Sequence, residues 1–255
     1  MTAAYEELRD HAVVHIWRGR APDTLTADAV ELLSDDERAT VRRLPGPAAA
    51  RYAAAHTAVR RVLAGYLDVP PRELVLGRRP CPRCAHPRHG RPRIDWPPTD
   101  LDFNLSRTGP HWLLAAVVGR QVGVDMEDDR TLDVAGASRL VLSASELAHV
   151  MGASGTERAH AFFRCWTRKE AVVKAIGVGI ITDLSEVDVR PAEDGPVLVT
   201  HQEPTGPDTW LVEDLPTVDG VFAALAREAG ATGPVVHRHY EDLDSADRTR
   251  EAVAP

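Results

Sequence analysis

The order in which helical and strand patterns follow one another restricts this chain to few folds. Apolar residues at helical spacing predict one long helix over residues 48–67 and another over residues 155–176. Short apolar or alternating stretches, typical of antiparallel strands, follow each of these helices. Helices followed by runs of strands indicate an α+β fold rather than a parallel sheet wound with helices. We therefore expect two halves, each made of helices followed by antiparallel strands.

Local signals place the remaining elements. Ser34 with Glu37, and Ser154 with Glu157, have the spacing of capping boxes, so helices are expected to begin after both serines. Gly177 is well placed as the left-handed residue that ends the second long helix. Strands are expected over residues 12–18, 101–105, 112–118, 122–127, 185–190, 196–200, 208–213 and 220–226, a further helical stretch over 135–150, and a long irregular loop over 77–100.

Composition limits the class of protein. The chain has 255 residues, of which 44% are hydrophobic, enough for one large domain or two of about 120 residues. It contains no apolar run of the roughly 18 residues that a membrane helix needs, and its first residues lack the apolar core of a secretory signal. Three cysteines are typical of a reduced, cytoplasmic protein. We expect a cytoplasmic monomer with no membrane contact.

Charge is distributed unevenly. The net charge is −8, yet residues 38–93 hold thirteen arginines against Asp68 and Glu73. A protein that binds nucleic acid over its whole surface would be basic overall, so we expect no nucleic-acid partner. A local basic segment fits a phosphate-rich small ligand or an acidic protein partner, and the alternative is a solvated arginine surface.

Lysine is almost absent from the chain. Against 28 arginines there are two lysines, Lys169 and Lys174, and both lie in one short stretch. An ammonium group is a compact charge with a tunable pKa, whereas a guanidinium is a planar fork that stays protonated. The pattern indicates positions that arginine cannot fill, the alternative being chance survival in an arginine-rich sequence.

Carboxylates accompany Lys174. Asp125 and Glu127 are two apart on an expected strand and so share a face. Trp166, Glu170 and Lys174 are each four apart on the second long helix and share a stripe. Three carboxylates suit a hard cation such as Mg²⁺, which takes carboxylates, waters and substrate phosphates. The alternative is two solvent-facing carboxylates and a surface ion pair.

Two of these segments together resemble the signature motifs of 4′-phosphopantetheinyl transferases. They are Gly123–Glu127, similar to G-[IV]-D-x-E, and Trp166–Lys174, similar to W-[ST]-x-K-E-x-x-x-K. Phe103–Gly109 resembles the family's F-N-[IL]-S-H-[ST] segment, and Gly90–Pro92 its G-K-P turn. In its length, the chain resembles members of the large subfamily, the surfactin-synthetase-activator type. This resemblance implies two similar halves related by a pseudo-two-fold axis, each with an antiparallel sheet packed against a long helix.

The resemblance also implies a reaction: transfer of 4′-phosphopantetheine from coenzyme A to a serine of an apo carrier protein, with release of adenosine 3′,5′-bisphosphate. The partner would be an acidic acyl or peptidyl carrier protein of fatty acid, polyketide or nonribosomal peptide synthesis. Asp125, Glu127 and Glu170 would hold the required Mg²⁺, and Asp125, Glu170 and Lys174 would be catalytic. Coenzyme A would be bound by Arg51, His89, Gly90, Arg91, Pro92, Ser106, Arg107 and Lys174.

The chain departs from the family pattern at several positions. Arg107 replaces a phosphate-contacting histidine, and Arg91 replaces the lysine of the G-K-P turn. Glu37 and Thr40 lie near positions that are basic in some relatives. The implied division places coenzyme A's 3′-phosphate and adenine on residues 1–120 and the metal and catalysis on residues 121–240, followed by a flexible tail, 241–255.

The irregular loop has a possible metal pattern of its own. Cys81 and Cys84 form a C-x2-C, with His86 and His89 close behind. These residues are suitable ligands for a structural Zn²⁺. A single C-x2-C is equally compatible with a reduced, exposed loop in which His89 lines the ligand site.

Two other functions are compatible with part of the pattern. Two acids and a lysine also form metal-dependent nuclease sites, although the acidic net charge and the E-x3-K spacing count against a nuclease. A zinc-pinned interaction module without catalysis would keep its function when Asp125 is removed.

Overall fold

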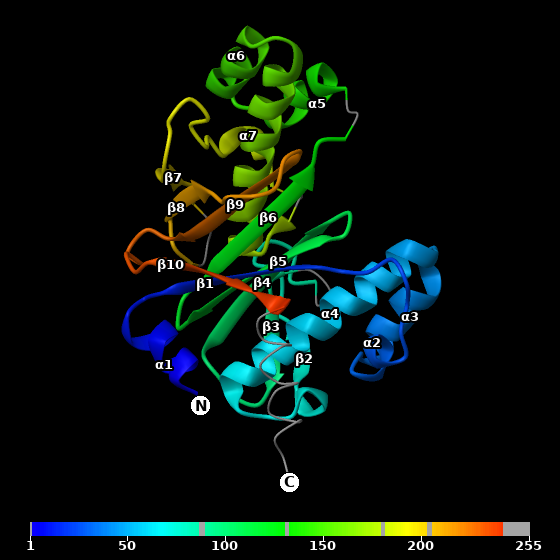
Figure 1. The fold of residues 1–255 in the computed structure, drawn as a ribbon. Helices are drawn as coiled ribbons and strands as arrows, with labels where there is room; N and C mark the ends of the chain where they lie inside the picture. Colours follow the sequence, from blue (N-terminus) through cyan, green and yellow to red (C-terminus); the bar gives the residue numbers. More distant parts are fainter. Residues whose placement is uncertain (1, 87–89, 131–132, 180–181, 203–205, 242–255) are drawn as a thin grey trace.

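Two four-stranded sheets and two long helices form the larger part of the structure, a computed structural model that describes residues 2–86, 90–130, 133–179, 182–202 and 206–241 (Figure 1). The first sheet has the order β10-β1-β5-β4 and the second the order β6-β9-β8-β7. β2 and β3 form a separate hairpin. The mixture of helices and mainly antiparallel strands confirms the α+β class, whereas the two-fold relation between the halves stays a prediction.

The first part of the chain supplies the first sheet and its helices. Its elements are α1 (Ala3–Asp10), β1 (Val14–Arg20), α2 (Asp28–Glu31), α3 (Asp35–Arg43), α4 (Gly46–Leu67), η1 (Pro71–Glu73), β2 (Val75–Arg78), β3 (Pro92–Trp96), β4 (Leu101–Thr108) and β5 (His111–Val118). The 22-residue helix α4 packs through Val59, Val62 and Leu63 against β-strand residues such as Phe103 and Leu114. This apolar cluster is the core of the first half.

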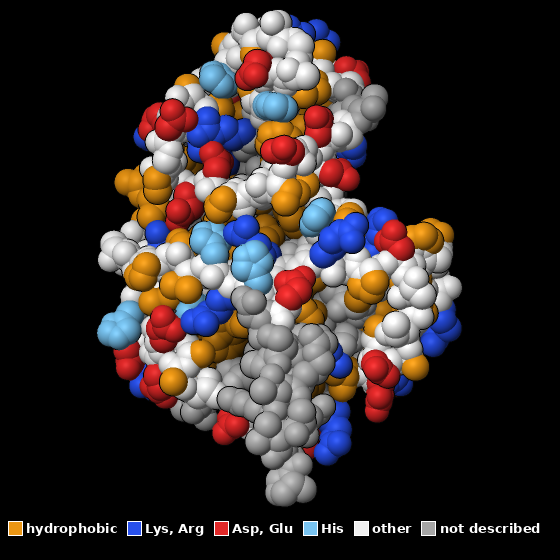
Figure 2. Space-filling view, viewed as in Figure 1, with side chains coloured by type: hydrophobic (Ala, Val, Ile, Leu, Met, Phe, Trp, Pro, Cys, Tyr) orange, Lys and Arg blue, Asp and Glu red, His pale blue; other side chains and the backbone are white. Residues whose placement is uncertain are grey.

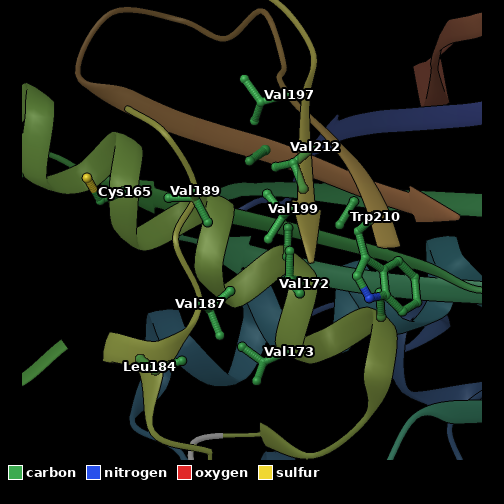
Figure 3. Close-up of a cluster of buried hydrophobic side chains, with 14 of the residues drawn as sticks. Cys165, Val172, Val173, Leu184, Val187, Val189, Val197, Val199, Trp210 and Val212 are labelled. Atoms are coloured by element: carbon green, nitrogen blue, oxygen red, sulfur yellow. The ribbon is translucent and has the colours of Figure 1, made fainter. Parts of the chain in front are cut away.

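The second part begins with β6 and returns to the first sheet at its end. Its elements are β6 (Val122–Asp128), α5 (Val134–Val141), α6 (Ala144–Gly152), α7 (Gly155–Ile176), η3 (Leu184–Glu186), β7 (Val197–Thr200), β8 (Thr209–Asp214), β9 (Val221–Glu228) and β10 (Val235–His239). Figure 3 shows Val172 and Val173 of α7 packed with Trp210 and Val212 of β8. β10 pairs in parallel with β1, so the last described strand belongs to the first sheet.

The two sheets also pack against each other. Val14 and Ile16 of β1 share an apolar cluster with Val122 and Val124 of β6 and with Leu225 of β9. Alternate residues of β1 and β5 therefore face two different cores, one under α4 and one between the sheets. Strands buried on both faces read as continuous apolar runs, and β5 is such a strand.

Side chains of β4 join the two sheets at a second place. β6 has a ladder partner, β9, on one edge. Along its other edge, Val124 N–H donates to Asn104 Oδ1 (3.3 Å) and Met126 N–H donates to Ser106 Oγ (3.1 Å). Asp128 N–H donates to Thr108 Oγ1 at 3.1 Å in the same way. Three polar residues spaced by two along β4 thus satisfy three buried or half-buried amides of β6, as buried amides require.

Gly123 allows α7 to lie directly on β6. A Cβ atom at this position would overlap the carbonyl oxygen of Ala171 and approach the amide nitrogen of Ala175. Both are backbone atoms of α7, so no side-chain rotation could relieve the overlap. The glycine therefore sets the distance between the strand that carries Asp125 and the helix that carries Glu170.

Several expected elements are confirmed. Ser34 and Glu37 form a complete capping box at the start of α3, and Gly177 ends α7 with a φ of 88°. The first long helix and the strands expected around 12–18, 101–105, 112–118, 122–127, 196–200, 208–213 and 220–226 are present, with ends shifted by a few residues.

Other expected elements differ from the structure in part or lie outside it. Ser154 makes no capping hydrogen bond, because Gly155 takes a left-handed conformation (φ 54°) that turns the chain at the helix start. The helical stretch 135–150 is two helices, since Ser143 caps a new one with Glu146. Residues 77–100 are not irregular throughout, because the hairpin β2–β3 begins and ends that segment with paired strands. The tail 242–255 lies outside the described residues.

Residues 185–190 form no strand. They comprise the end of a short 3-10 helix followed by an extended segment. The buried residues Val187 and Val189 direct their backbone groups to side chains rather than to another strand. Lys169 Nζ donates to Val187 O, Arg168 Nη1 donates to Val189 O (3.0 Å), and Val189 N–H donates to Glu146 Oε1 (2.8 Å). The alternating pattern therefore reflects burial against α7, not sheet pairing.

Among the described residues, no helix is both long and apolar enough to cross a bilayer.

The close approach at Gly123 can be tested with a matched glycine. We expect Gly123→Ala to lower the free energy of unfolding by about 1–3 kcal/mol, because the added methyl must push α7 away from β6. Gly65 lies in the exposed face of α4 with nothing within 4 Å of its missing Cβ. Gly65→Ala should therefore be neutral or stabilising by up to about 1 kcal/mol. Urea denaturation followed by circular dichroism measures both, and equal effects would contradict the packing argument.

Candidate active site

The residues of the two motifs meet in one pocket. It has a volume of about 320 Å³ and lies where β4, β6 and α7 converge. Its lining combines three carboxylates and two cations with a serine, an indole and two apolar side chains: Asp125, Glu127, Glu170, Arg107, Lys174, Ser106, Trp166, Leu105 and Met126. The strand period of two places Asp125 and Glu127 here, the helix spacing of four places Glu170 and Lys174, and the packing of β4 adds Ser106 and Arg107, so six of the predicted site residues meet.

Asp125 is held at the centre of this pocket. It is 3% exposed, and its Oδ1 accepts hydrogen bonds from Lys174 Nζ (2.5 Å) and from Ser106 Oγ (3.0 Å). Lys174 Nζ also donates to Ser106 Oγ at 2.9 Å. With the amide of Met126 as a further donor, the Ser106 hydroxyl uses its one proton and both lone pairs. The serine therefore fixes the positions of the acid and the lysine.

Glu127 lies two residues further along the same face of β6. One oxygen, Oε1, accepts a hydrogen bond from the indole Nε1 of Trp166 at 3.1 Å. The other, Oε2, accepts one from Arg130 Nη1 at 2.7 Å. Trp166 comes from α7, so the indole orients the carboxylate toward the helix that carries Glu170 and Lys174. Arg130 neutralises Glu127 from the exposed side of the pocket.

Glu170 is the least compensated of the three acids. Its Oε1 is buried and has no hydrogen-bond partner among the described residues. Burial, and then the negative charge of Asp125, raise the pKa of Glu170 to about 7, despite the opposing charge of Lys174. A carboxyl group with a pKa near neutrality is suited to accept and release a proton under physiological conditions. It can equally ionise when a cation enters the pocket.

The acids of the pocket are of the type that binds a hard divalent cation. Oδ2 of Asp125 is a second buried carboxylate oxygen without a partner in the described part of the chain, beside the orphaned oxygen of Glu170. Carboxylate oxygens are the protein ligands that Mg²⁺ prefers. Within residues 2–86, 90–130, 133–179, 182–202 and 206–241, no three His, Cys, Asp or Glu side chains are grouped so that they could hold a metal ion. Lys174 instead neutralises Asp125.

The other residues expected to bind coenzyme A do not line this pocket. Arg51, on α4, forms an ion pair with Asp23 at 2.5 Å. Arg91 is buried and forms an ion pair with Asp102 at 2.8 Å. Gly90 has a φ of 90°, and its carbonyl oxygen accepts a hydrogen bond from Arg78 at 3.0 Å. Pro92 begins β3. His89 lies outside the described residues. The roles of these residues in binding stay predictions.

The cysteine–histidine loop is partly described. Cys81 is buried, Cys84 is exposed and His86 is half-buried. Since His89 lies outside the described residues, zinc binding here stays a prediction. The buried pair of Arg91 and Asp102 anchors the end of this loop, and the Arg91 side chain packs over Gly177 at the end of α7.

The two lysines have different environments. Lys174 is 29% exposed and reaches the pocket, whereas Lys169 is fully buried. Lys169 Nζ donates to Glu146 Oε2 (2.7 Å), to Leu184 O (2.8 Å) and to Val187 O. All three of its protons are used, which a compact ammonium can do in this space and a planar guanidinium cannot. Lys169 therefore has a structural role next to Glu170.

Sequence reasoning missed two groups of the site. Arg130 follows Glu127 by three residues, but it lies beyond the expected end of the strand, where no periodic pattern marks it. Tyr52 lies on α4, and its ring is below the guanidinium of Arg107, with Cζ 4.8 Å from the ring centroid. The sequence shows Tyr52 only as one of several residues at helical spacing in this helix. A contact between residues 55 positions apart leaves no local signal.

Comparison with known proteins identifies the class. The model of the 4′-phosphopantetheinyl transferase superfamily matches residues 121–226, which contain β6, α7 and the three carboxylates. The chain is 29% identical over 222 residues to the 4′-phosphopantetheinyl transferase HetI of Nostoc sp., covering 84% of this chain and 86% of that protein.

Two Bacillus proteins match a shorter segment. The chain is 33% identical over 128 residues to the 4′-phosphopantetheinyl transferase psf-1 of Bacillus pumilus, covering 49% of this chain and 54% of that protein. It is 28% identical over 117 residues to the 4′-phosphopantetheinyl transferase Sfp of Bacillus subtilis, covering 46% and 51%. The chain thus spans most of HetI and about half the length of these two relatives.

Residues 121–226 match the 4′-phosphopantetheinyl transferase superfamily, and the matched relatives indicate that the chain is a transferase enzyme. This assignment confirms the resemblance seen in the two motifs. It also favours a transferase over the nuclease and the non-catalytic module that the sequence left open.

The structural role of Lys169 predicts an asymmetry between the lysines. We expect Lys169→Arg to lower the free energy of unfolding by about 1–3 kcal/mol, because the larger head group must fit a fully buried site. The same change at Lys174 should cost less than about 0.5 kcal/mol, since its head group reaches a partly exposed pocket. Denaturant titration of both variants measures the difference. Equal losses of stability in the two variants would contradict the structural role assigned to the buried Lys169.

The raised pKa of Glu170 predicts a pH effect on stability in the metal-free protein. A carboxyl group whose pKa is about 7 when folded and 4.5 when unfolded stabilises the fold fully below about pH 4.5, and this contribution is lost as the pH rises through 7. Glu170→Gln keeps the neutral form at every pH. In EDTA, the melting temperature of the variant should therefore exceed that of the wild type increasingly between pH 5 and pH 8. Parallel pH profiles would show that Glu170 has an ordinary pKa.

Proposed function

We propose that the protein transfers 4′-phosphopantetheine from coenzyme A to a serine of an apo carrier protein, releasing adenosine 3′,5′-bisphosphate. The observation that carries the proposal is the meeting of Asp125, Glu127 and Glu170 with two cations, Arg107 and Lys174, in one pocket. Acids suited to a metal, next to cations suited to a phosphate, are what a pyrophosphate-cleaving site needs. The names of the relatives support the transferred group.

The two cations enter the pocket from different elements. Lys174 comes from α7 and Arg107 from β4. Both would draw the pyrophosphate of coenzyme A into the pocket and stabilise the charge that develops as it breaks. Arginine at position 107 also offers two parallel N–H donors to one phosphate, a geometry that a histidine cannot provide. The substitution thus preserves the phosphate contact expected of the family segment.

Glu170 is well suited to take the proton of the attacking serine. Without a bound metal, Glu170 has a pKa of about 7, so an appreciable fraction of it is ionised near neutrality and can accept a proton. The serine oxygen would bond to the phosphorus that carries the pantetheine arm. The bond from that phosphorus to the bridging oxygen would break, leaving its electron pair on adenosine 3′,5′-bisphosphate. Lys174 can give the leaving phosphate a proton and regain one from solvent.

Asp125, Glu127 and Glu170 would hold Mg²⁺. When bound, Mg²⁺ would neutralise charge on the pyrophosphate and make its phosphorus more electrophilic. Ser106 has a supporting task, because its hydrogen bonds keep Asp125 and Lys174 in place for the incoming substrate.

The division of labour along the chain is also a proposal. Residues 1–120 would bind the nucleotide end of coenzyme A, and residues 121–240 would supply the acids. The basic segment 38–93 suits both the 3′-phosphate and an acidic carrier protein. In the space-filling view, the outline is indented between the part that holds α5–α7 and the part that holds α2–α4 (Figure 2). We further propose a monomer that acts in the cytoplasm.

One assay tests the proposed activity. Purified protein is incubated with an apo carrier protein, coenzyme A and MgCl₂, and the carrier is weighed by mass spectrometry. A shift by the mass of phosphopantetheine supports the proposal, and EDTA should abolish it. An unchanged carrier mass with several acyl and peptidyl carriers would contradict it.

The acid assignment predicts a contrast on one strand. Asp125→Asn should lower the transfer rate about 100-fold or more, because a preorganised charge that acts on the transition state is lost. Asp128→Asn is the matched control. Asp128 lies on the same strand at its half-exposed end and does not line the pocket, so its variant should keep the wild-type rate. Near-normal transfer by the Asp125 variant, with a cooperative thermal transition, would remove Asp125 from the reaction.

A further inference from the structure

Arg107 is a cation without an ionic partner among the described residues. It lines the pocket, and no carboxylate of the described residues lies within ion-pair distance of its guanidinium. The other pocket cation, Lys174, is tied to Asp125. An exposed arginine with no partner normally samples many rotamers, and ordering it on binding an anion costs conformational free energy. Something else must hold Arg107 if it is to meet a phosphate efficiently.

The side chain that holds Arg107 is Tyr52. The guanidinium carbon lies over the ring of Tyr52, 4.8 Å from its centroid. This distance is within the range of a cation–π interaction, which leaves the N–H groups of the guanidinium available for other acceptors. A carboxylate in the same place would neutralise the arginine and compete with a phosphate. An aromatic ring orients the cation without using up its charge.

Tyr52 is in turn fixed by residues of α3 and α4. His56 stacks on its ring with centroids 3.9 Å apart and an interplanar angle of 17°. Behind this pair, Glu37 accepts a hydrogen bond from His56 Nδ1 (3.0 Å) and from Arg60 Nη2 (2.7 Å).

Glu37 is ionised in this cluster. Burial alone would raise its pKa, but hydrogen bonds from His56 and Ser34 and the charge of Arg60 lower the pKa to about 2. The acid therefore balances Arg60, with which it forms an ion pair, and forms none with Arg107. Glu37, which lies near positions that are basic in some relatives, thus holds His56, the residue that stacks on Tyr52.

We propose that Tyr52 is a positioning residue for the donor substrate: it holds the Arg107 guanidinium toward the pocket, and so sets the affinity for the diphosphate of coenzyme A. The inference rests on the proposed function, because it takes coenzyme A as the donor. Tyr52 acts through Arg107 and does not itself touch the reacting atoms. Its loss should therefore weaken donor binding much more than it slows the chemical step at saturating donor.

A double-mutant cycle tests the coupling. Tyr52→Leu, Tyr52→Phe, Arg107→Ala and the double variant Tyr52→Leu/Arg107→Ala are titrated with coenzyme A and MgCl₂ by calorimetry. Transfer to the carrier is then measured over a range of coenzyme A concentrations. We expect Tyr52→Leu to raise Kd and KM about three- to tenfold with kcat within about twofold of wild type. Tyr52→Phe keeps the ring and should bind like the wild type.

The decisive comparison is made without the arginine. In the Arg107→Ala background, Tyr52→Leu should change the affinity for coenzyme A by less than about 1.5-fold, because its only route to the donor has gone. An equal loss in both backgrounds would overturn the proposal and would indicate that Tyr52 contacts the donor directly. Wild-type affinity in Tyr52→Leu, or weak binding in a well-folded Tyr52→Phe, would also overturn it. Thermal melting of each variant identifies any that fails to fold. If Tyr52→Leu does not fold, the affinity of Tyr52→Phe for coenzyme A decides the outcome.

Measurements on the wild-type protein distinguish a failure of the proposed function from a failure of the role proposed for Tyr52. If it neither binds coenzyme A nor changes the carrier mass, the proposed function and this inference both fall. If the wild type binds and transfers normally while Tyr52→Leu is indistinguishable from it, only the role of Tyr52 is overturned.

Discussion

The structure depends on three side-chain hydrogen bonds between β4 and β6. Asn104, Ser106 and Thr108 accept the amide protons of the β6 edge that has no ladder partner among the described strands. Without these acceptors, amides of β6 would be buried unpaired, at a cost of about 1–3 kcal/mol each. The same bonds fix the two sheets against one another. Ser106 also hydrogen-bonds with Asp125 and Lys174. The contact that connects the two sheets therefore lies at the centre of the pocket.

Charge burial is managed differently on the two sides of α7. Lys169 and Glu146 form a fully buried pair whose remaining hydrogen-bonding groups are satisfied by the backbone of residues 184–189 and by a helix cap. Asp125 and Glu170, on the pocket side, each keep a buried oxygen without a partner in the described part of the chain. A satisfied pair stabilises a structure, whereas unsatisfied acids are a cost that substrate and metal binding can offset. Adjacent residues of one helix thus separate the structural task from the chemical one.

Much of the fold and site was predictable because its signals are local. The period of two placed Asp125 and Glu127 on one face, and the spacing of four placed Glu170 beside Lys174. The capping box at Ser34 needs only residues three apart. Predictions failed where residues distant in the sequence determine the local structure. Residues 185–190 alternate like a strand, but side chains of α6 and α7 satisfy their backbone groups, and no propensity in the segment records this.

The sequence by itself determined the α+β class, the motif residues that share a face, and the transferase family. These follow from periodicity and from short spacings, which physical chemistry fixes within one or two turns of chain. Only the tertiary structure decided that Lys169 is a buried structural residue and that Lys174 lines the pocket. It also decided that the ring of Tyr52 lies beneath the guanidinium of Arg107. Burial and pairing between distant segments depend on how α4, β4 and α7 pack, and packing is a property of the whole chain rather than of any segment in it.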